Sequence, residues 1–322
     1  MRLVFVLMAF LLPNIVPAQV PTGWEIEFPK GDFSKSVISF DEIESDGNTR
    51  DSIPPVFEPR YQPASKVRGL SDFEPVLSIE RNGDARAYPL SIMLWHEIVN
   101  ETIGGDALLI TYCPLCNSGV VFLRGVEGRL LTFGNTGRLR NLDMVMYDHQ
   151  TESWWQQFSG RAIIGTLSGA TMKPVPSRIE ALVDFQARNP RGLVLVPTNR
   201  RARPYGTSPF GGMDTRPASR RFSKWPVPAP VAPMDYVVVV GDHAWPLSRV
   251  RQARRIEEAG TVLEWRKGRN SLHDSRQIEQ GRDLGSVEVT DLAGALVVHD
   301  VVFAFAFAAF VSDGKWMLGT GQ

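Results

Sequence analysis

The hydrophobic and polar positions of the chain alternate over short stretches along most of its length. Apolar stretches rich in Val, Ile, Leu and Phe are separated by Gly, Pro, Asn and Asp, which is typical of β-strands joined by turns. The turn signal Asn82-Gly83-Asp84, for example, separates two such stretches. The pattern predicts strands at residues 74–79, 85–88, 107–112, 120–124, 130–133, 145–147, 192–197, 235–241 and 301–311.

Two segments have apolar residues at the spacing of a helix. The first is Leu90–Asn100, which follows Pro89 and ends before Gly104-Gly105. The second is Ile179–Arg188. Residues 198–234, rich in Arg, Pro and Gly, predict a long irregular segment. Together these patterns predict an α+β fold, built mostly of β-strands with a few short helices.

The first residues of the chain have the features of an export signal. Arg2 is followed by an apolar run from Leu3 to Leu12, and Ala18 is a small residue suited to cleavage. The run is shorter than the roughly 20 residues that a bilayer-spanning helix needs. We therefore expect a signal peptide at 1–18, an extended arm at 19–70 and a single domain at 71–322. The mature protein would be periplasmic or extracellular, with no transmembrane segment.

Composition and charge narrow the classes of partner. Hydrophobic residues make up 43% of the chain and the formal net charge is +0, which describes an ordinary globular protein and gives no reason to expect nucleic-acid binding. Charge is uneven, however, because residues 25–58 are acidic and residues 188–224 are basic. The basic segment is interpreted either as an anion-binding face or as a solvated loop that docks against the acidic arm.

The chain has only two cysteines, Cys113 and Cys116, and they are two residues apart. A disulfide closing so short a loop would stabilise the fold by only about 2 kcal/mol, so stability alone is a poor reason for the pair. The motif lies between two predicted strands, on a tight turn. No helix-forming run follows Cys116, which argues against a thioredoxin-like fold. We expect thiol redox chemistry, in which one thiolate attacks a disulfide or oxidant and the other thiol resolves the intermediate.

A metal site is the alternative interpretation. A closed zinc site needs four ligands and the chain has no second CxxC, so histidines would have to complete it. His96, at the edge of the apolar face of the first predicted helix, is the preferred candidate, and two thiolates with imidazole would suit zinc or copper. In the alternative interpretation of His96, the side chain is half-buried, has its hydrogen bonds satisfied and binds no metal. Supporting residues are expected beside the motif and in the downstream aromatic segment: Tyr112, Asn117, Asp148 and Trp155.

Several segments resemble the DUF3179 family, a domain of unknown function. The most specific is Thr111-Tyr112-Cys113-Pro114-Leu115-Cys116-Asn117, and the likeness extends over roughly residues 70–311. Family members are typically exported or membrane-associated, and some are selenoproteins. The resemblance implies redox work at the CxxC, because a selenocysteine in place of a thiol would serve that purpose. It implies no particular reaction, substrate or redox partner, and an exported scaffold with an inert disulfide is a further alternative.

Overall fold

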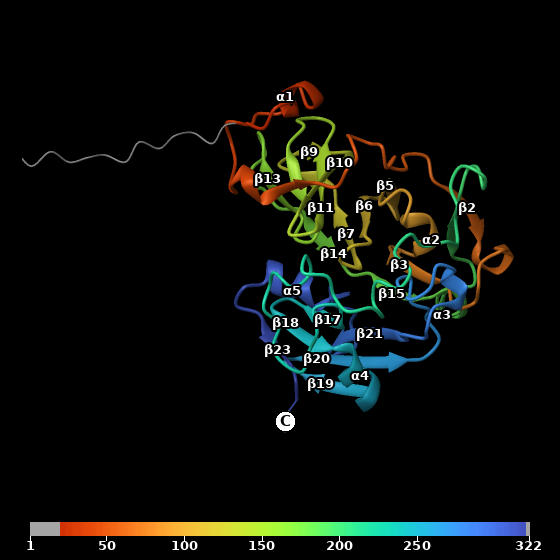
Figure 1. Cartoon of the computed structure of the whole chain (residues 1–322). Coiled ribbons are helices and arrows are strands. Elements are labelled where there is room, and N and C mark those ends of the chain that lie inside the picture. Colours follow the sequence, from red (N-terminus) through yellow and green to blue (C-terminus); the bar gives the residue numbers. More distant parts are fainter. Residues whose placement is uncertain (1–19, 320–322) are drawn as a thin grey trace, which may run out of the picture.

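The computed structural model describes residues 20–319 of the chain. The predicted signal peptide at 1–18 lies outside this range. Most of the regular structure in the described part is β-strand and the helices are few and short, as predicted (Figure 1). The longest helices have seven residues. The helices are α1 (Trp24–Glu27), α2 (Leu90–Met93), α3 (Leu182–Arg188), α4 (Leu247–Ala253) and α5 (Ala304–Phe310), with 3-10 turns η1 (Phe40–Glu42), η2 (Ala64–Lys66) and η3 (Ile278–Gln280).

Two sheets are formed largely by the first half of the chain. One has the order β15 (Arg178–Ala181), β3 (Pro75–Arg81), β4 (Asp84–Pro89), β16 (Leu193–Val196) and β2 (Arg60–Pro63). The other, called the cysteine sheet, has the order β14 (Lys173–Val175), β7 (Ser118–Leu123), β6 (Asp106–Cys113) and β5 (Ile98–Ile103).

The second half of the chain forms two further sheets. One has the order β22 (Asp300–Phe303), β17 (Tyr236–Val240), β18 (His243–Pro246) and β23 (Lys315–Trp316). The other has the order β19 (Arg255–Glu258), β20 (Thr261–Arg266) and β21 (Ser286–Asp291).

The fifth sheet, called the aspartate sheet, is built mainly from residues 133–164. Its order is β1 (Ile43–Ser45), β10 (Phe133–Arg140), β11 (Asp143–Asp148), β12 (Trp154–Gln156) and β13 (Arg161–Ile164), and a small ribbon of β8 (Gly125–Val126) and β9 (Arg129–Leu130) precedes it. On β12, Trp154 and Trp155 face opposite sides and pack into different hydrophobic clusters, as expected for neighbours on a strand. The Trp155 cluster also contains both cysteines, so this sheet packs directly on the CxxC.

The five sheets together resemble the blades of a five-bladed β-propeller, but their connectivity repeats twice rather than five times. In each half a hairpin leads into a helix after proline, namely β3-β4-α2 at Pro89 and β17-β18-α4 at Pro246. In the first half, β15 pairs with β3, and β16, which follows the seven-residue helix α3, pairs parallel to β4. In the second half, β22 pairs with β17, and β23, which follows the seven-residue helix α5, pairs parallel to β18. The segments Ala87–Ser91 and Ala244–Ser248, which are alike in sequence, occupy equivalent positions.

Backbone details match between the halves. In each half, the first residue of the seven-residue helix, α3 or α5, donates a backbone hydrogen bond to the residue just before the first hairpin strand. These bonds are Leu182 N to Glu74 O (2.9 Å) and Ala304 N to Asp235 O (2.8 Å). The two halves also interlock, since Asp300 on β22 accepts hydrogen bonds from Gly119 on β7. The second half therefore supports the strand that follows the cysteines.

Two sequence predictions were wrong, and a third was wrong in part, because Ile179–Ala181 of the second predicted helix lies in β15 and only Leu182–Arg188 is helical. The helix predicted over Leu90–Asn100 ends after α2 at Met93, because Ile98–Ile103 pairs with β6 as strand β5. The strand predicted over 301–311 ends at Phe303 and continues as α5. In both segments apolar residues are buried on every side, so periodicity alone could not separate helix from strand. Residues 198–234 hold no helix or strand, as predicted.

No helix among residues 20–319 has both the length and the apolar character required to cross a membrane.

Candidate functional site

The CxxC lies on a tight turn between two strands of the cysteine sheet, as predicted. β6 ends at Cys113, β7 begins at Ser118, and these two residues pair across the turn. Asn117 adopts a left-handed φ of 54°, which Asn tolerates better than most residues. Its backbone N–H donates to the Pro114 carbonyl (3.3 Å) and closes the turn.

Side chains of the turn tie it to the second half of the chain. The Tyr112 hydroxyl donates to Asn117 Oδ1 (2.9 Å), and Asn117 Nδ2 donates to the Val301 carbonyl (2.5 Å). The Phe303 backbone N–H donates to the Cys116 carbonyl (2.9 Å). Tyr112 and Asn117 therefore shape and anchor the turn.

His273 contacts the same turn from the second half of the chain. Its Nε2 lies 2.7 Å from the Pro114 carbonyl and its Nδ1 lies 3.2 Å from the Tyr236 hydroxyl. Burial lowers the pKa of His273 to about 4, so the ring is neutral at physiological pH. Since a carbonyl only accepts, Nε2 carries the proton and donates to Pro114.

Asp143 is brought to the cysteines by a hairpin of the aspartate sheet. The two residues of the turn, Asn141 and Leu142, have φ of 52° and 64°, which is the geometry of a type I′ hairpin. Leu142 is an unusual residue there, because a side chain with Cβ is strained in the left-handed region. Its carbonyl accepts a hydrogen bond from Cys116 Sγ (3.4 Å), and its side chain is buried.

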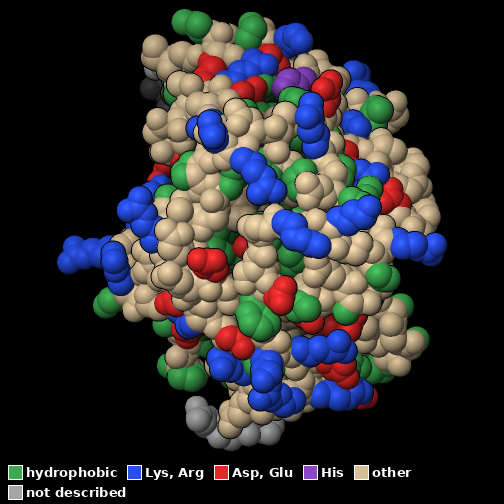
Figure 2. Space-filling view, turned by 90° about the vertical axis from the view of Figure 1, so that its right-hand side faces the viewer, with side chains coloured by type: hydrophobic (Ala, Val, Ile, Leu, Met, Phe, Trp, Pro, Cys, Tyr) green, Lys and Arg blue, Asp and Glu red, His purple; other side chains and the backbone are tan. Residues whose placement is uncertain are grey.

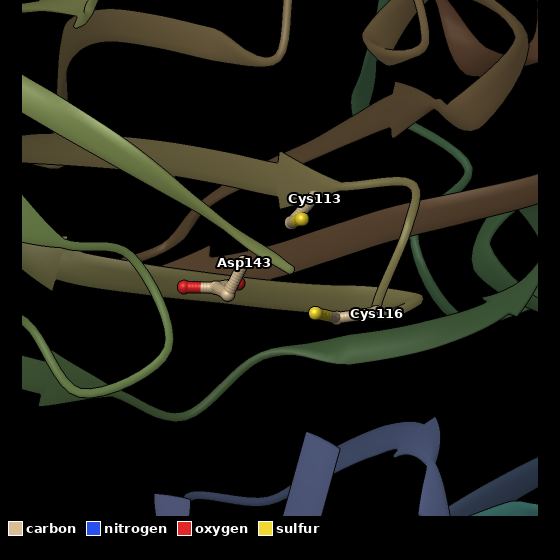
Figure 3. A group of neighbouring side chains, drawn as sticks. All are labelled: Cys113, Cys116 and Asp143. Carbon is tan, nitrogen blue, oxygen red and sulfur yellow. The ribbon is translucent and has the colours of Figure 1, made fainter. Parts of the chain in front are cut away.

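Cys113, Cys116 and Asp143 form a compact buried group (Figure 3). One ligand atom from each, the two sulfurs and a carboxylate oxygen, lie within 4.8 Å of one another. The exposed fraction is 1% for Cys113 and 0% for Cys116 and Asp143. Three groups able to bind a cation therefore converge from two different sheets.

The hydrogen bonding of Asp143 is incomplete. Its Oδ2 accepts from Gln156 Nε2 (2.6 Å) and from the Phe158 backbone N–H (2.9 Å). Its Oδ1 is buried and has no hydrogen-bond partner within the described residues. A buried polar atom without a partner is costly, so its presence beside two thiols calls for an explanation.

Burial shifts the acid–base equilibria of all three groups toward their neutral forms. It raises the pKa of the Cys113 thiol, and it raises the pKa of the Cys116 thiol well above the ordinary range. It also raises the pKa of Asp143 to about 6, against the opposing effect of the Phe158 and Gln156 hydrogen bonds and of the neighbouring Cys113 and Cys116 thiols. In the absence of a bound cation, both sulfurs are therefore protonated near neutral pH.

A pocket of about 240 Å³ borders this group on the Cys113 side. Its wall is mostly apolar, and Glu97 and Asn135 supply polar groups. The Glu97 carboxylate accepts from Asn135 Nδ2, and burial raises its pKa to about 8. Asp46 and Arg221 also line the pocket, and Cys113 is part of its wall whereas Cys116 is not.

His96 is not part of the cysteine–aspartate group. Its Nδ1 lies 2.9 Å from the Pro54 carbonyl and its Nε2 lies 2.9 Å from the Tyr205 hydroxyl, so both ring nitrogens are engaged elsewhere. The expected placement of His96 relied on a helix that continues to Asn100, and the chain leaves that helix before His96. The structure thus associates Asp143 with the thiols, where the sequence proposed His96.

Asp148 and Trp155 pair with each other. Trp155 Nε1 donates to Asp148 Oδ2 (3.0 Å), and both residues are fully buried. Trp155 packs in the hydrophobic cluster that contains the cysteines, while Asp148 is outside the metal-ligating group. Their contribution to the site is to pack and orient the aspartate sheet.

Sequence reasoning missed Asp143, Glu97 and His273. The available signal for Asp143 was a carboxylate opening the otherwise apolar run Met144–Tyr147, because a charged residue on a buried strand needs a partner. Glu97 and His273 gave no comparable signal, since their approach to the CxxC depends on contacts between distant segments.

The chain is similar to a known protein family. The sequence model of the family described as "Protein of unknown function (DUF3179)" matches residues 50–314. No curated protein and no solved structure matches the chain. Because the match covers most of the chain, including the whole CxxC turn and Asp143, the protein belongs to the DUF3179 family.

Proposed function

We propose that Cys113, Cys116 and Asp143 bind a metal ion, most suitably zinc. The observation that carries this proposal is the buried Oδ1 of Asp143, which lacks a hydrogen-bond partner while its carboxylate lies beside two convergent thiols. A cation would supply the missing partner for the carboxylate. It would also bind both sulfurs as thiolates, the form that metals require.

The ligand set favours zinc over hard cations. Thiolate sulfur suits zinc and copper(I), whereas magnesium and calcium prefer oxygen ligands. Three protein ligands are the number found in catalytic zinc sites, in which water or substrate takes the fourth position. The pocket next to Cys113 gives a fourth ligand room to approach.

The raised pKa values are consistent with this role. Two buried thiols with raised pKa are poor nucleophiles near neutral pH, which weakens the case for simple thiol exchange. A bound divalent cation would lower the pKa values of all three ligands, because it stabilises their charged forms. Metal binding should therefore release protons.

The test is metal content and affinity of the full chain. Protein refolded with zinc and passed through gel filtration should retain about one zinc per chain, and Cys113→Ser and Cys116→Ser should each lose it. Leu109→Val, in the same hydrophobic cluster at a side chain without a ligand atom, is the matched control. Wild-type protein that elutes without zinc or copper after loading with each metal would refute the proposal.

Thiol redox chemistry is the second candidate, favoured by the fact that Cys113 lines an accessible pocket. Cys113 thiolate would attack one sulfur of a small disulfide, releasing a thiolate and forming a mixed disulfide. Cys116 would pass its proton to Asp143 and attack Cys113 Sγ as the thiolate, forming the intramolecular disulfide and releasing the second half of the small disulfide as a thiolate. Loss of two hydrogen atoms from the protein mass on treatment with oxidised glutathione, which is reduced to two glutathione molecules, would support this function if reductant reverses it.

A further inference from the structure

A second pocket shares no lining residue with the pocket beside Cys113 and lies next to the basic segment of the chain. It has a volume of about 220 Å³ and is formed by the turn at 67–70, the start of α2 and residues 195–206. Figure 2 looks onto the side of the molecule where these segments lie and shows Lys and Arg side chains spread across its middle.

Two arginines of this pocket have no carboxylate partner. Arg68 Nη1 donates to the backbone carbonyls of Val67 (2.9 Å) and Ser65 (3.4 Å), and Arg200 Nη2 donates to the carbonyl of Arg68 (3.4 Å). Neither forms an ion pair within residues 20–319. Two exposed arginines therefore border one pocket without a carboxylate partner.

The two ends of the basic segment are neutralised by acidic residues. Arg221 and Lys224 contact Glu44 at 3.4 Å and 2.9 Å, so the acidic arm neutralises one end. Arg188 pairs with Glu180 and Glu80 at the other end. The arginines between the ends have no acidic partner within residues 20–319, and Arg200 is the one of them that lines the pocket.

Gly69 makes room for the Arg200 guanidinium. Its φ is 82°, and a Cβ built there would lie 3.2 Å from Arg200 Nη1. A side chain at this position would both strain the turn and displace the guanidinium. The turn is thus suited to holding Arg200 close to the pocket.

The pocket also offers neutral polar groups. The Ser91 hydroxyl lines it and is buried, and it lies beside the buried Glu74 carboxyl, which accepts from the Ser91 backbone N–H (3.1 Å). Since His96 Nδ1 must donate to the Pro54 carbonyl, its Nε2 accepts from the Tyr205 hydroxyl. This arrangement leaves the Tyr205 oxygen with lone pairs and orients the ring beside the pocket.

The remaining wall is apolar. It is formed by aliphatic residues from three separate segments, among them Leu70, Ile92 and Leu195. A ligand matching this pocket therefore has one anionic end and one hydrocarbon end.

We propose that this pocket binds a small amphipathic anion, a carboxylate or phosphate group carried on a short hydrocarbon. The anionic group contacts Arg68, Arg200 and the Ser91 hydroxyl, and the hydrocarbon lies on the aliphatic wall. Guanidinium groups bind carboxylate and phosphate oxygens through two parallel hydrogen bonds, which makes arginine the suitable residue. The site is independent of the cysteine–aspartate group and of the function proposed for it.

Calorimetry of the full chain with four probes tests the proposal: hexanoate, hexyl phosphate, inorganic phosphate and hexanol. We expect the first two to bind and hexanol to bind at least about tenfold more weakly, because a charge-assisted hydrogen bond contributes about 1.5–3 kcal/mol. The stronger of the two anions identifies the headgroup. Binding of inorganic phosphate as tightly as hexyl phosphate would contradict the role of the apolar wall.

Substitution of the pocket arginines tests whether their positive charges bind the anionic group. Arg200→Gln and Arg68→Gln should each weaken hexanoate binding about tenfold, whereas Arg201→Gln, exposed and outside the pocket, should leave it unchanged. Equal affinity for hexanoate and hexanol, or unchanged affinity in Arg200→Gln, would overturn the proposal, as would absence of binding to either anion. If a variant fails to fold, wild-type protein decides the matter, since added salt should weaken hexanoate binding and spare hexanol.

Discussion

Cys116 Sγ donates a hydrogen bond to the carbonyl of Leu142, and this 3.4 Å contact joins the tips of two sheets. The contact sets the position of Asp143, the next residue, relative to the CxxC turn. Leu142 holds a left-handed φ of 64° to make it. Strain in a non-glycine residue next to three convergent ligands is the kind of local cost that is found at functional sites.

Replacing Asp143 with Asn should separate metal binding from packing. The amide is nearly isosteric with the carboxylate and can still accept hydrogen bonds from Gln156 and Phe158. Zinc affinity should fall more than about 100-fold, exceeding the 10- to 100-fold loss typical of outer partners of ligands. Competition with a chromophoric chelator measures this change.

Asp148→Asn is the control, because Asp148 is also buried in the aspartate sheet but is outside the ligand group. It should lower the melting temperature, because both carboxylate oxygens accept hydrogen bonds from Trp155 and Thr151 and the amide keeps only one of these oxygens, while zinc affinity of the folded protein stays intact. Equal zinc affinity in the Asp143→Asn variant and the wild type would exclude Asp143 as a ligand.

Substitution of His273 should affect stability, whereas substitution of His96 should leave the cysteine site unaffected. His273→Ala removes the donor to Pro114 and should destabilise the CxxC turn, costing about 1–3 kcal/mol in unfolding free energy measured with urea. His96→Ala should leave zinc content and thiol reactivity unchanged, since its ring nitrogens are engaged by Pro54 and Tyr205. A drop in zinc content specific to His96→Ala would restore the ligand set predicted from sequence.

Local sequence signals predicted the strands around the CxxC and the tight turn between them. They failed at Leu90–Asn100 and at 301–311, where apolar residues are buried on all sides and the partner strand decides the conformation. They also failed at Asp143, because its distance from the cysteines depends on how two sheets pack. Resemblance of Ala87–Ser91 to Ala244–Ser248 was a faint signal of the two-fold topology, which only strand order makes evident.

Export is a prediction that depends on the first residues of the chain alone. If the signal is cleaved after Ala18, protein purified from its native compartment should begin near Gln19. N-terminal sequencing or intact mass decides the matter. An intact Met1 on the native protein would contradict export by a cleaved signal.

The metal-free protein should lose stability as pH rises through neutrality. Burial raises the pKa of Glu97 from 4.5 to about 8 and that of Glu74 from 4.5 to about 7. Between these limits the folded state binds more protons than the unfolded state, so the stability contributed by the neutral carboxyls is complete below pH 4.5 and decreases above it. The slope approaches about 1.4 kcal/mol per pH unit for each proton.

His273 acts in the opposite direction, but only at lower pH. Its pKa falls from 6.5 to about 4 on folding, so its effect on stability is complete above pH 6.5. The range from pH 6.5 to 8 therefore isolates the carboxyls. Urea unfolding of chelator-treated protein across this range should show decreasing stability, and Glu97→Gln should flatten the curve because its amide stays neutral. A profile that Glu97→Gln leaves unchanged would mean that Glu97 is already ionised in the folded protein.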